Sequence, residues 1–306
     1  MSGAFVNLAH QAAITLDLDK RLRTCAHRGC RRGQMIWYRL CRHRRGTYLG
    51  NRWYCSPECL ERGVLELLSE LSRARPLQRT IRHRIPIGLL MMSQGLISSG
   101  QLRSAIELQR ESGGVKLGEC LQRLGFVSEE QVVAALAQQW ACPVFRWNLK
   151  DQCCDSVVPA GLQQALRAIP VYQNQFTRTL YIGFSETVNY TALRLLQEML
   201  ECRAEPCIVA ASVLDRYLQR LQQRSRRAEA SFDLPIAQEE VGAIVREYVV
   251  KSGAGKVQGT LCGDRFWFRL SQGTAMDLLF RMGETDSTRT TTGSRRVPGR
   301  EIQLES

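Results

Sequence analysis

The sequence predicts a multidomain α+β protein, built from a small zinc module, a helical tandem-repeat domain and a small α+β sheet domain. Three observations support this: two close cysteine pairs near the N-terminus, an internal repeat with helical periodicity, and a later stretch of alternating helix and strand patterns. A chain of 306 residues has room for two or three domains. We expect the units 1–75 (zinc module and following helix), 80–150 (tandem repeat), 151–223 (α+β subdomain), 232–282 (a small α+β piece) and 283–306 (a disordered tail).

The cysteines of the first unit indicate a metal site. Cys25 and Cys30 form a C-x4-C pair, and Cys55 and Cys59 form a C-x3-C pair at the start of a predicted helix. Two strand-like runs, 34–40 and 50–55, lie between the pairs, and a small module of this layout suits structural zinc bound by four thiolates. Further candidate ligands are Cys41, His27 and His43.

Neither a disulfide framework nor a catalytic zinc is expected. The twelve cysteines occur in a chain whose start lacks the features of an export signal. No H-x-E or HExxH pattern offers the carboxylate base that a catalytic zinc needs.

An internal repeat defines the second unit. Pro86–Gln109 and Lys116–Gln139 align at a shift of 30 residues, which superposes Gly88 on Gly118, Gly95 on Gly125 and Gln109 on Gln139. Each copy predicts a short helix, a glycine in a left-handed C-terminal cap, an apolar pair, and a second helix capped by Ser98 or Ser128.

The packing pattern of the sequence does not account for two features of each copy: the glycine near the start of the first helix and the glutamine at the end of the second. A glycine at a helix start exposes backbone N–H groups to an anion, and a glutamine offers both a donor and an acceptor. Two copies would then present two half-sites with pseudo-twofold symmetry.

The repeat resembles the N-terminal domain, in its MshE-N form, of type II secretion and type IV pilus assembly ATPases. Tandem copies in that family bind cyclic di-GMP. The chain departs from the family pattern at three positions. Pro86 and Lys116 replace the arginines of that pattern, and Gln122 replaces an aliphatic residue. The resemblance implies a ligand site or, alternatively, a degenerate copy that serves as a protein docking domain. The implied cyclic di-GMP residues are Ile87, Gly88, Gly95, Gln109, Lys116, Leu117, Gly118, Gly125 and Gln139.

The third unit alternates helices and strands. The patterns predict helices over 159–168, 190–200 and 212–221, and strands over 169–173, 179–184 and 206–211. This order resembles the second N-terminal subdomain of the same ATPases, so that the resemblance extends from about residue 85 to 221.

No ATPase motor is expected after it. The stretch "KSGAGKVQG" resembles a phosphate-binding loop, but Val250 stands where the first glycine belongs and Val257 where a hydroxyl must hold magnesium. The last unit predicts a helix and a β-hairpin in which the aromatic run Phe266–Phe268 forms strand core.

These expectations describe a non-enzymatic cytoplasmic regulator or adaptor that senses cyclic di-GMP and docks a protein of a secretion or pilus-like system. No apolar run reaches the roughly 18 residues of a membrane span. We therefore expect that any attachment to the inner membrane would depend on such a partner. The alternative is a zinc-containing nucleic-acid-binding regulator, because the formal net charge of +13 attracts polyanions. A solvated basic surface explains the same charge.

Overall fold

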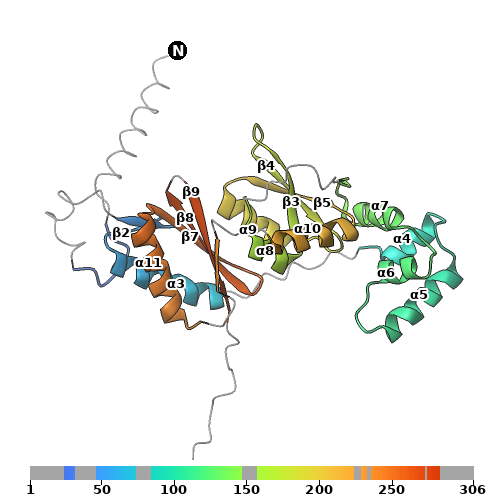
Figure 1. Cartoon of the computed structure of the whole chain (residues 1–306), viewed down its shortest axis with the longest axis horizontal. Coiled ribbons are helices and arrows are strands. Elements are labelled where there is room, and N and C mark those ends of the chain that lie inside the picture. The colour runs from blue at the N-terminus through green and yellow to red at the C-terminus, as the bar shows by residue number, and fades with distance from the viewer. Residues whose placement is uncertain are drawn as a thin grey trace, which may run out of the picture.

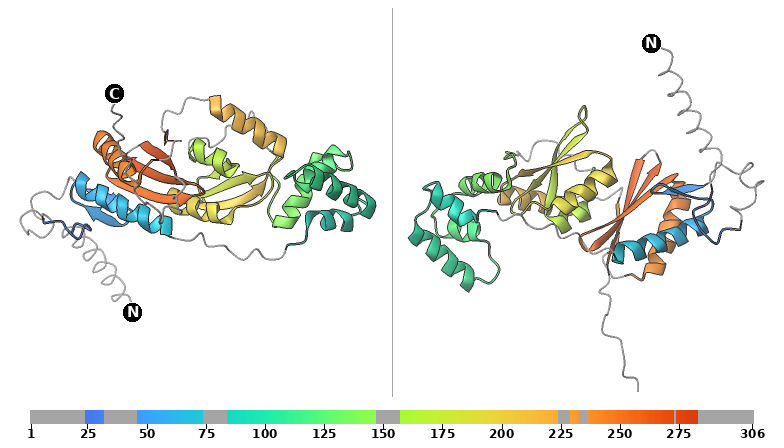
Figure 2. Two further views of the ribbon diagram at one scale, coloured as in Figure 1. Left: turned by 90° about the horizontal axis from the view of Figure 1, so that it is seen from below. Right: turned by 180° about the vertical axis from the view of Figure 1, so that it is seen from behind.

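The structure is a computed structural model that describes residues 24–31, 46–73, 84–146, 157–223, 229–232, 236–272 and 274–282. Its elements form three parts that lie in a row (Figures 1 and 2). Among the described residues, no helix combines the length and the hydrophobicity that crossing a membrane requires. The predicted strand 34–40, Cys41, His43 and the tail 283–306 lie outside the described residues.

The helices are α3 (Pro57–Arg73), α4 (Ile87–Ser93), α5 (Ser99–Glu111), α6 (Leu117–Arg123), α7 (Glu129–Trp140), α8 (Ala160–Leu166), α9 (Tyr190–Leu200), α10 (Ala211–Gln223) and α11 (Gln238–Ser252). The strands are β1 (Thr47–Leu49), β2 (Arg52–Tyr54), β3 (Ala168–Asn174), β4 (Thr179–Phe184), β5 (Arg203–Ile208), β6 (Glu229–Phe232), β7 (Lys256–Cys262), β8 (Arg265–Gln272) and β9 (Thr274–Arg281).

Segments from both sides of the repeat build one six-stranded sheet. Its order is β2-β1-β7-β8-β9-β6, with β1 parallel to β7 and β6 parallel to β9. The N-terminal module and the 232–282 piece, which we expected as separate units, therefore share one sheet. We call this unit (β1, β2, α3, β6, α11 and β7–β9) the composite domain.

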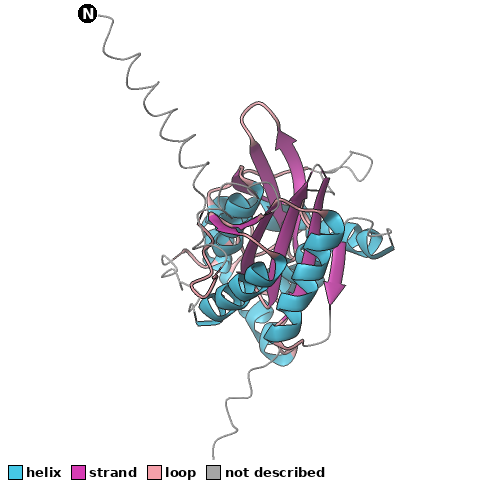
Figure 3. Cartoon of the chain, turned by 90° about the vertical axis from the view of Figure 1, so that its left-hand side faces the viewer, coloured by secondary structure: helices cyan, strands magenta, loops and turns pink. Residues whose placement is uncertain are grey.

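Strand alternation gives this sheet two buried faces. Phe266 and Phe268 lie on the face that packs with α3 and α11, whereas Trp267 points to the core shared with α8 and α9. All three side chains are buried, which agrees with their prediction as strand core. Figure 3, in which the composite domain faces the viewer, shows helices lying across its strands.

The hairpin of the cysteine module differs from the prediction. The strand Arg52–Tyr54 pairs with Thr47–Leu49, immediately before it, through a turn at Gly50, whose φ is 58°. Positive φ carries no steric cost at glycine, so the chain can reverse within two residues.

The middle part is a three-stranded sheet of order β3-β4-β5. The strand Thr179–Phe184 and the helix Tyr190–Leu200 have the predicted bounds, whereas β5 begins at Arg203, three residues before the predicted 206–211. Proline has no N–H to donate to a neighbouring strand, so Pro206 is typical of the first residue of a strand. In the structure it instead pairs with Ile182 inside the parallel ladder.

The repeat folds as two helix pairs with the predicted caps. Gly95 and Gly125 both have φ of 70°. Ser98 and Ser128 each accept from the backbone of a glutamine three residues later, whose side chain accepts in return from the serine N–H. The same local chemistry therefore sets the turn in both copies.

Candidate functional site

The structure brings the four predicted metal ligands together. The Sγ atoms of Cys25, Cys30, Cys55 and Cys59 all lie within 4.8 Å of one another. Cys30 and Cys55 are 3.5 Å apart and Cys55 and Cys59 are 3.9 Å apart, between Sγ atoms. Zinc–sulfur bonds of about 2.3 Å in a tetrahedron place sulfurs roughly 3.8 Å apart, so the donor set fits one zinc ion.

Local structure holds these ligands in place. The N–H of Ala26 donates to the carbonyl of Trp53 at 2.8 Å, which fixes the first pair against the hairpin. The N–H of Cys59 donates to Ser56 Oγ at 3.3 Å at the start of α3. Burial raises the pKa of Cys59 to about 11 and raises that of Cys55 as well. A cation is therefore what would keep this cluster in the thiolate form.

The structure gives the early glycines a packing role that the sequence did not reveal. A Cβ at residue 88 would lie 2.5 Å from Leu102 Cδ1 and 3.0 Å from Leu117 Cδ2. A Cβ at residue 118 would lie 2.9 Å from Val132 Cγ1, at the position that matches Leu102. In each copy the glycine thus lets the second helix pack tightly against the first.

The two terminal glutamines make reciprocal bonds across the repeat. Gln109 Nε2 of the first copy donates to the carbonyl of Val115, just before the second copy, at 2.9 Å. Gln139 Nε2 of the second copy donates to the carbonyl of Ile85, just before the first copy, at 2.7 Å. Each glutamine therefore lies at the start of the opposite copy. We define the first half-site as 86–88 with Gln139 and the second as 116–118 with Gln109.

Lys116 of the second half-site faces the middle part of the molecule. Its Nζ lies 3.9 Å from Glu186 Oε2, and both side chains are about half exposed. An exposed ion pair of this length contributes little free energy, so the ammonium group remains available to another anion.

A cation beside the first half-site escaped sequence reasoning. Arg84 lies two residues before Pro86, and its Cζ is 3.3 Å from the ring centroid of Trp140 and 5.8 Å from that of Tyr190. Its Nη1 is buried without a hydrogen-bond partner among the described residues. In the sequence, the one sign of this cation is that Arg84 lies just before the first copy and Trp140 just after the second.

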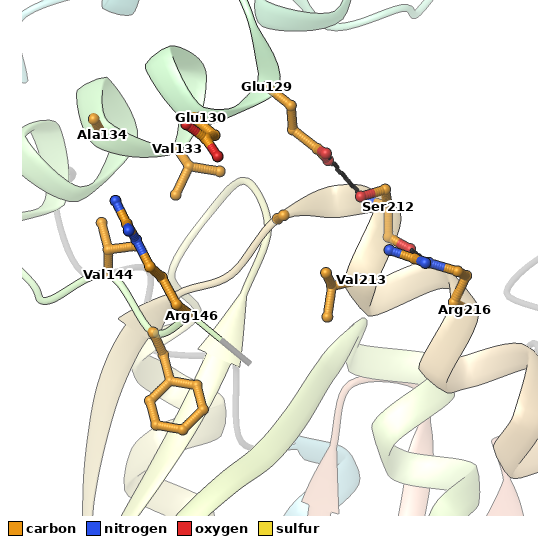
Figure 4. A pocket seen from close by; sticks show the side chains of 11 residues that line it. Glu129, Glu130, Val133, Ala134, Val144, Arg146, Ser212, Val213 and Arg216 are labelled. Atoms are coloured by element: carbon orange, nitrogen blue, oxygen red, sulfur yellow. Dashed lines mark hydrogen bonds between the residues drawn. The ribbon is translucent and has the colours of Figure 1, made fainter. Parts of the chain in front are cut away.

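A groove of about 650 Å³ lies between the repeat and the middle part (Figure 4). Glu129, at the start of α7, accepts from the Ser212 N–H at 2.8 Å and from the Ser212 Oγ at 2.7 Å. This carboxylate thereby joins α7 to the N-terminus of α10, where the helix dipole favours negative charge. The groove is lined by Glu129, Glu130, Val133, Ala134, Val144, Phe145, Arg146, Ala210, Ser212, Val213 and Arg216.

Comparison with known proteins finds matches in part of the chain. No family model matches the sequence. The type IV pilus assembly ATPase PilB of Thermus thermophilus is 22% identical over 122 residues, which are 39% of this chain and 14% of PilB. The chain therefore spans a small fraction of the length of this relative.

Two solved structures are similar to this chain. A structure of MshE with cdg (cyclic di-GMP) shares 28% identity and covers 45% of this chain and 99% of its own, with a TM-score of 0.38. The N-terminal domain of XpsE shares 16% identity and covers 44% of this chain and 92% of its own, with a TM-score of 0.33. The sequence match to PilB agrees with the resemblance to pilus and secretion ATPases that the repeat indicated.

Proposed function

We propose that this protein is a non-enzymatic adaptor that binds cyclic di-GMP through its tandem repeat and docks a protein of a secretion or pilus-like system. The observation that carries the proposal is the reciprocal arrangement of the copies: Gln109 bonds at the start of the second and Gln139 at the start of the first. Two half-sites with pseudo-twofold symmetry suit a ligand made of two equal halves, and cyclic di-GMP is such a ligand.

Each half-site has a cation in it or close to it in the sequence. Lys116 belongs to the second half-site and offers a mobile point charge. Beside the first half-site, Pro86 offers no charge, but Arg84 presents a guanidinium that is fixed on Trp140. Guanidinium groups bind phosphates through paired, charge-assisted hydrogen bonds. We therefore assign Arg84 to the first half of the ligand and Lys116 to the second.

Structural zinc completes the proposal. Four thiolates leave no open coordination position, so the ion would hold the two cysteine pairs together and perform no chemistry. Bound zinc would neutralise part of the thiolate charge and fix the β1–β2 hairpin.

Calorimetric titration with cyclic di-GMP tests the ligand assignment. We expect wild type to bind. Lys116→Ala, which loses a charged hydrogen bond, and Gln139→Ala, which loses one or two neutral ones, should each weaken binding by about tenfold. Gln138→Ala is the matched control, because Gln138 is on the same helix but bonds to Gln94. If wild type gives no heat with ligand at about 500 μM, the nucleotide assignment is wrong.

A further inference from the structure

One short segment of the middle part lies beside both cations that we assigned to the ligand. The segment 186–190 follows β4 and ends at the first residue of α9. Its first residue, Glu186, places Oε2 3.9 Å from Lys116 Nζ. Its last residue, Tyr190, has its ring centroid 5.8 Å from Arg84 Cζ. The two half-sites of the repeat therefore meet the middle part at one place.

The backbone that carries Glu186 is anchored on both sides. Ser185, at the end of β4, is buried, and Val188 is buried in the core of the middle part. Asn189 Oδ1 then accepts a backbone N–H of the first turn of α9 at 3.0 Å, which caps that helix. The half-exposed carboxylate of Glu186 is thus presented to Lys116 from a fixed backbone.

The two cations have different neighbours. Arg84 lies against the rings of Trp140 and Tyr190, and a guanidinium on a ring face can still donate hydrogen bonds from its edge. Lys116 instead lies beside a carboxylate. An ammonium group has three donors and can contact two anions, but a phosphate at Lys116 would then lie a few ångströms from Glu186, and like charges repel.

The strength of the ion pair sets the size of this effect. Both side chains are about half exposed, and an exposed pair of this length changes an equilibrium by less than about fivefold. A ligand that also bonds to the rest of the repeat can therefore displace the carboxylate, at the cost of part of its affinity.

We propose that Glu186 is an internal competitor of the ligand. Its carboxylate lowers the affinity of the second half-site for a phosphate, and ligand binding exchanges the Lys116–Glu186 pair for a Lys116–phosphate pair. The inference rests on the proposed cyclic di-GMP function and names a regulatory contact of the same site. Because the exchanged pair joins the repeat to the middle part, ligand binding removes one of the contacts between them.

Calorimetric titration of the full chain with cyclic di-GMP tests the competition. Glu186→Gln keeps the size of the side chain and removes its charge, so we expect binding about two- to fivefold tighter than wild type. Glu186→Asp keeps the charge and should gain less. Glu198→Gln is the matched control, because Glu198 is an exposed glutamate of α9 that pairs with Arg194, and it should bind as wild type does.

Three results of this titration overturn the inference. The first is an affinity of Glu186→Gln equal to or weaker than that of wild type, since a weaker one would mean that the carboxylate contributes a bond to the ligand. The second is an equal gain in Glu186→Asp, and the third is an equal gain in Glu198→Gln. Unchanged melting temperatures show that the variants remain folded.

A double-mutant cycle places the effect at Lys116. In the Lys116→Ala background, Glu186→Gln should lose at least about half of its gain, because the two side chains no longer interact. In the wild-type background the gain should shrink between about 50 and 500 mM salt, which screens exposed charges. A full gain without Lys116 overturns the inference. If wild type binds and Glu186→Gln gains nothing, the competitor alone is wrong; if neither binds at about 500 μM, the nucleotide assignment fails with it.

Discussion

Thr47 donates a hydrogen bond from its hydroxyl to the carbonyl of Ala254, 207 residues further along the chain, at 3.2 Å. The parallel pairs of Tyr48 with Lys256 and of Leu49 with Val257 follow directly. The cysteine cluster adjoins β1 and β2, so its state should affect strands that are distant in sequence. The stability of the composite domain is therefore expected to depend on metal.

Cys59→Ser tests this dependence. We expect one zinc per chain in wild type and a loss of that zinc in the variant, measured by elemental analysis, because three thiolates bind zinc much more weakly than four. The loss of zinc should also lower the unfolding temperature of the composite domain. Acidification should also release the metal, since protons compete for the thiolates as the pH falls.

Cys202→Ala is the control for this experiment. Cys202 lies in the middle part, outside the cluster, and the variant should keep its zinc. Full zinc content in Cys59→Ser would contradict the four-cysteine site.

Gly88→Ala and Gly118→Ala test the packing role of the early glycines. The Cβ at 88 approaches two leucine side chains, at 2.5 and 3.0 Å, whereas the Cβ at 118 approaches one valine at 2.9 Å. We expect both variants to lose about 1–3 kcal/mol of unfolding free energy, with the larger loss at 88. Urea denaturation measures this, and a larger loss at 118 would contradict the packing account.

Arg84→Ala tests the assignment of the first half-site. The variant should bind cyclic di-GMP about tenfold more weakly, because a charge-assisted bond is lost. Arg84→Lys should recover only part of the affinity, since an ammonium group cannot donate two parallel bonds. Arg103→Ala on the exposed side of α5 is the control. Equal affinity of Arg84→Ala and wild type in calorimetry would remove Arg84 from the site.

Glu129→Ala removes the carboxylate that joins α7 to α10. We expect a loss of about 1 kcal/mol in the unfolding free energy, comparable to the loss of a helix cap, because Glu129 is only partly buried. Glu130→Ala, the neighbouring exposed glutamate, should leave stability unchanged. Chemical denaturation of both variants measures the difference, and equal effects would show that the bonds to Ser212 contribute no net stability.

Asp277→Ala should be the most destabilising of these substitutions. Asp277 Oδ1 accepts from Trp267 Nε1 at 2.8 Å, and Arg269 Nη2 lies 3.3 Å from Oδ2, all within the buried sheet. The variant leaves a buried guanidinium without its anion, at a cost of about 3 kcal/mol or more. Asp264→Ala, which breaks an exposed pair with Arg281, is the control. Similar melting temperatures for the two variants would contradict this role.

Local signals explain what could be predicted. The strand Thr179–Phe184, the helix that follows Asn189, and the two serine caps of the repeat each depend on residues within a few positions. The cysteine pairs could be identified from the sequence for the same reason, because the two members of each pair lie in one turn. The pairing of β1 with β7 and of β6 with β9 left no such mark, since nothing local specifies a partner so far along the chain.

The candidate site shows the same division. The sequence revealed Gln109 and Gln139 as repeated residues, but it did not reveal their partners. Gln109 bonds locally to Val115, whereas the bond of Gln139 to Ile85 is a tertiary contact. The glycines were assigned to an exposed backbone, whereas side chains of other helices of the repeat crowd them. Arg84 has no counterpart at position 114, where Gly114 stands, so the alignment could not identify it.

The composite domain also constrains the order in which its parts can pair during synthesis. At about 5–20 residues per second, the 207 residues between Thr47 and Ala254 delay the arrival of β7 by roughly 10–40 s. All four cysteines of the cluster precede residue 60, so a metal can reach them in the nascent chain before most of the sheet exists. β1 can therefore complete its parallel pairing with β7 only after most of the chain has been made, and a chain truncated before β7 lacks that partner.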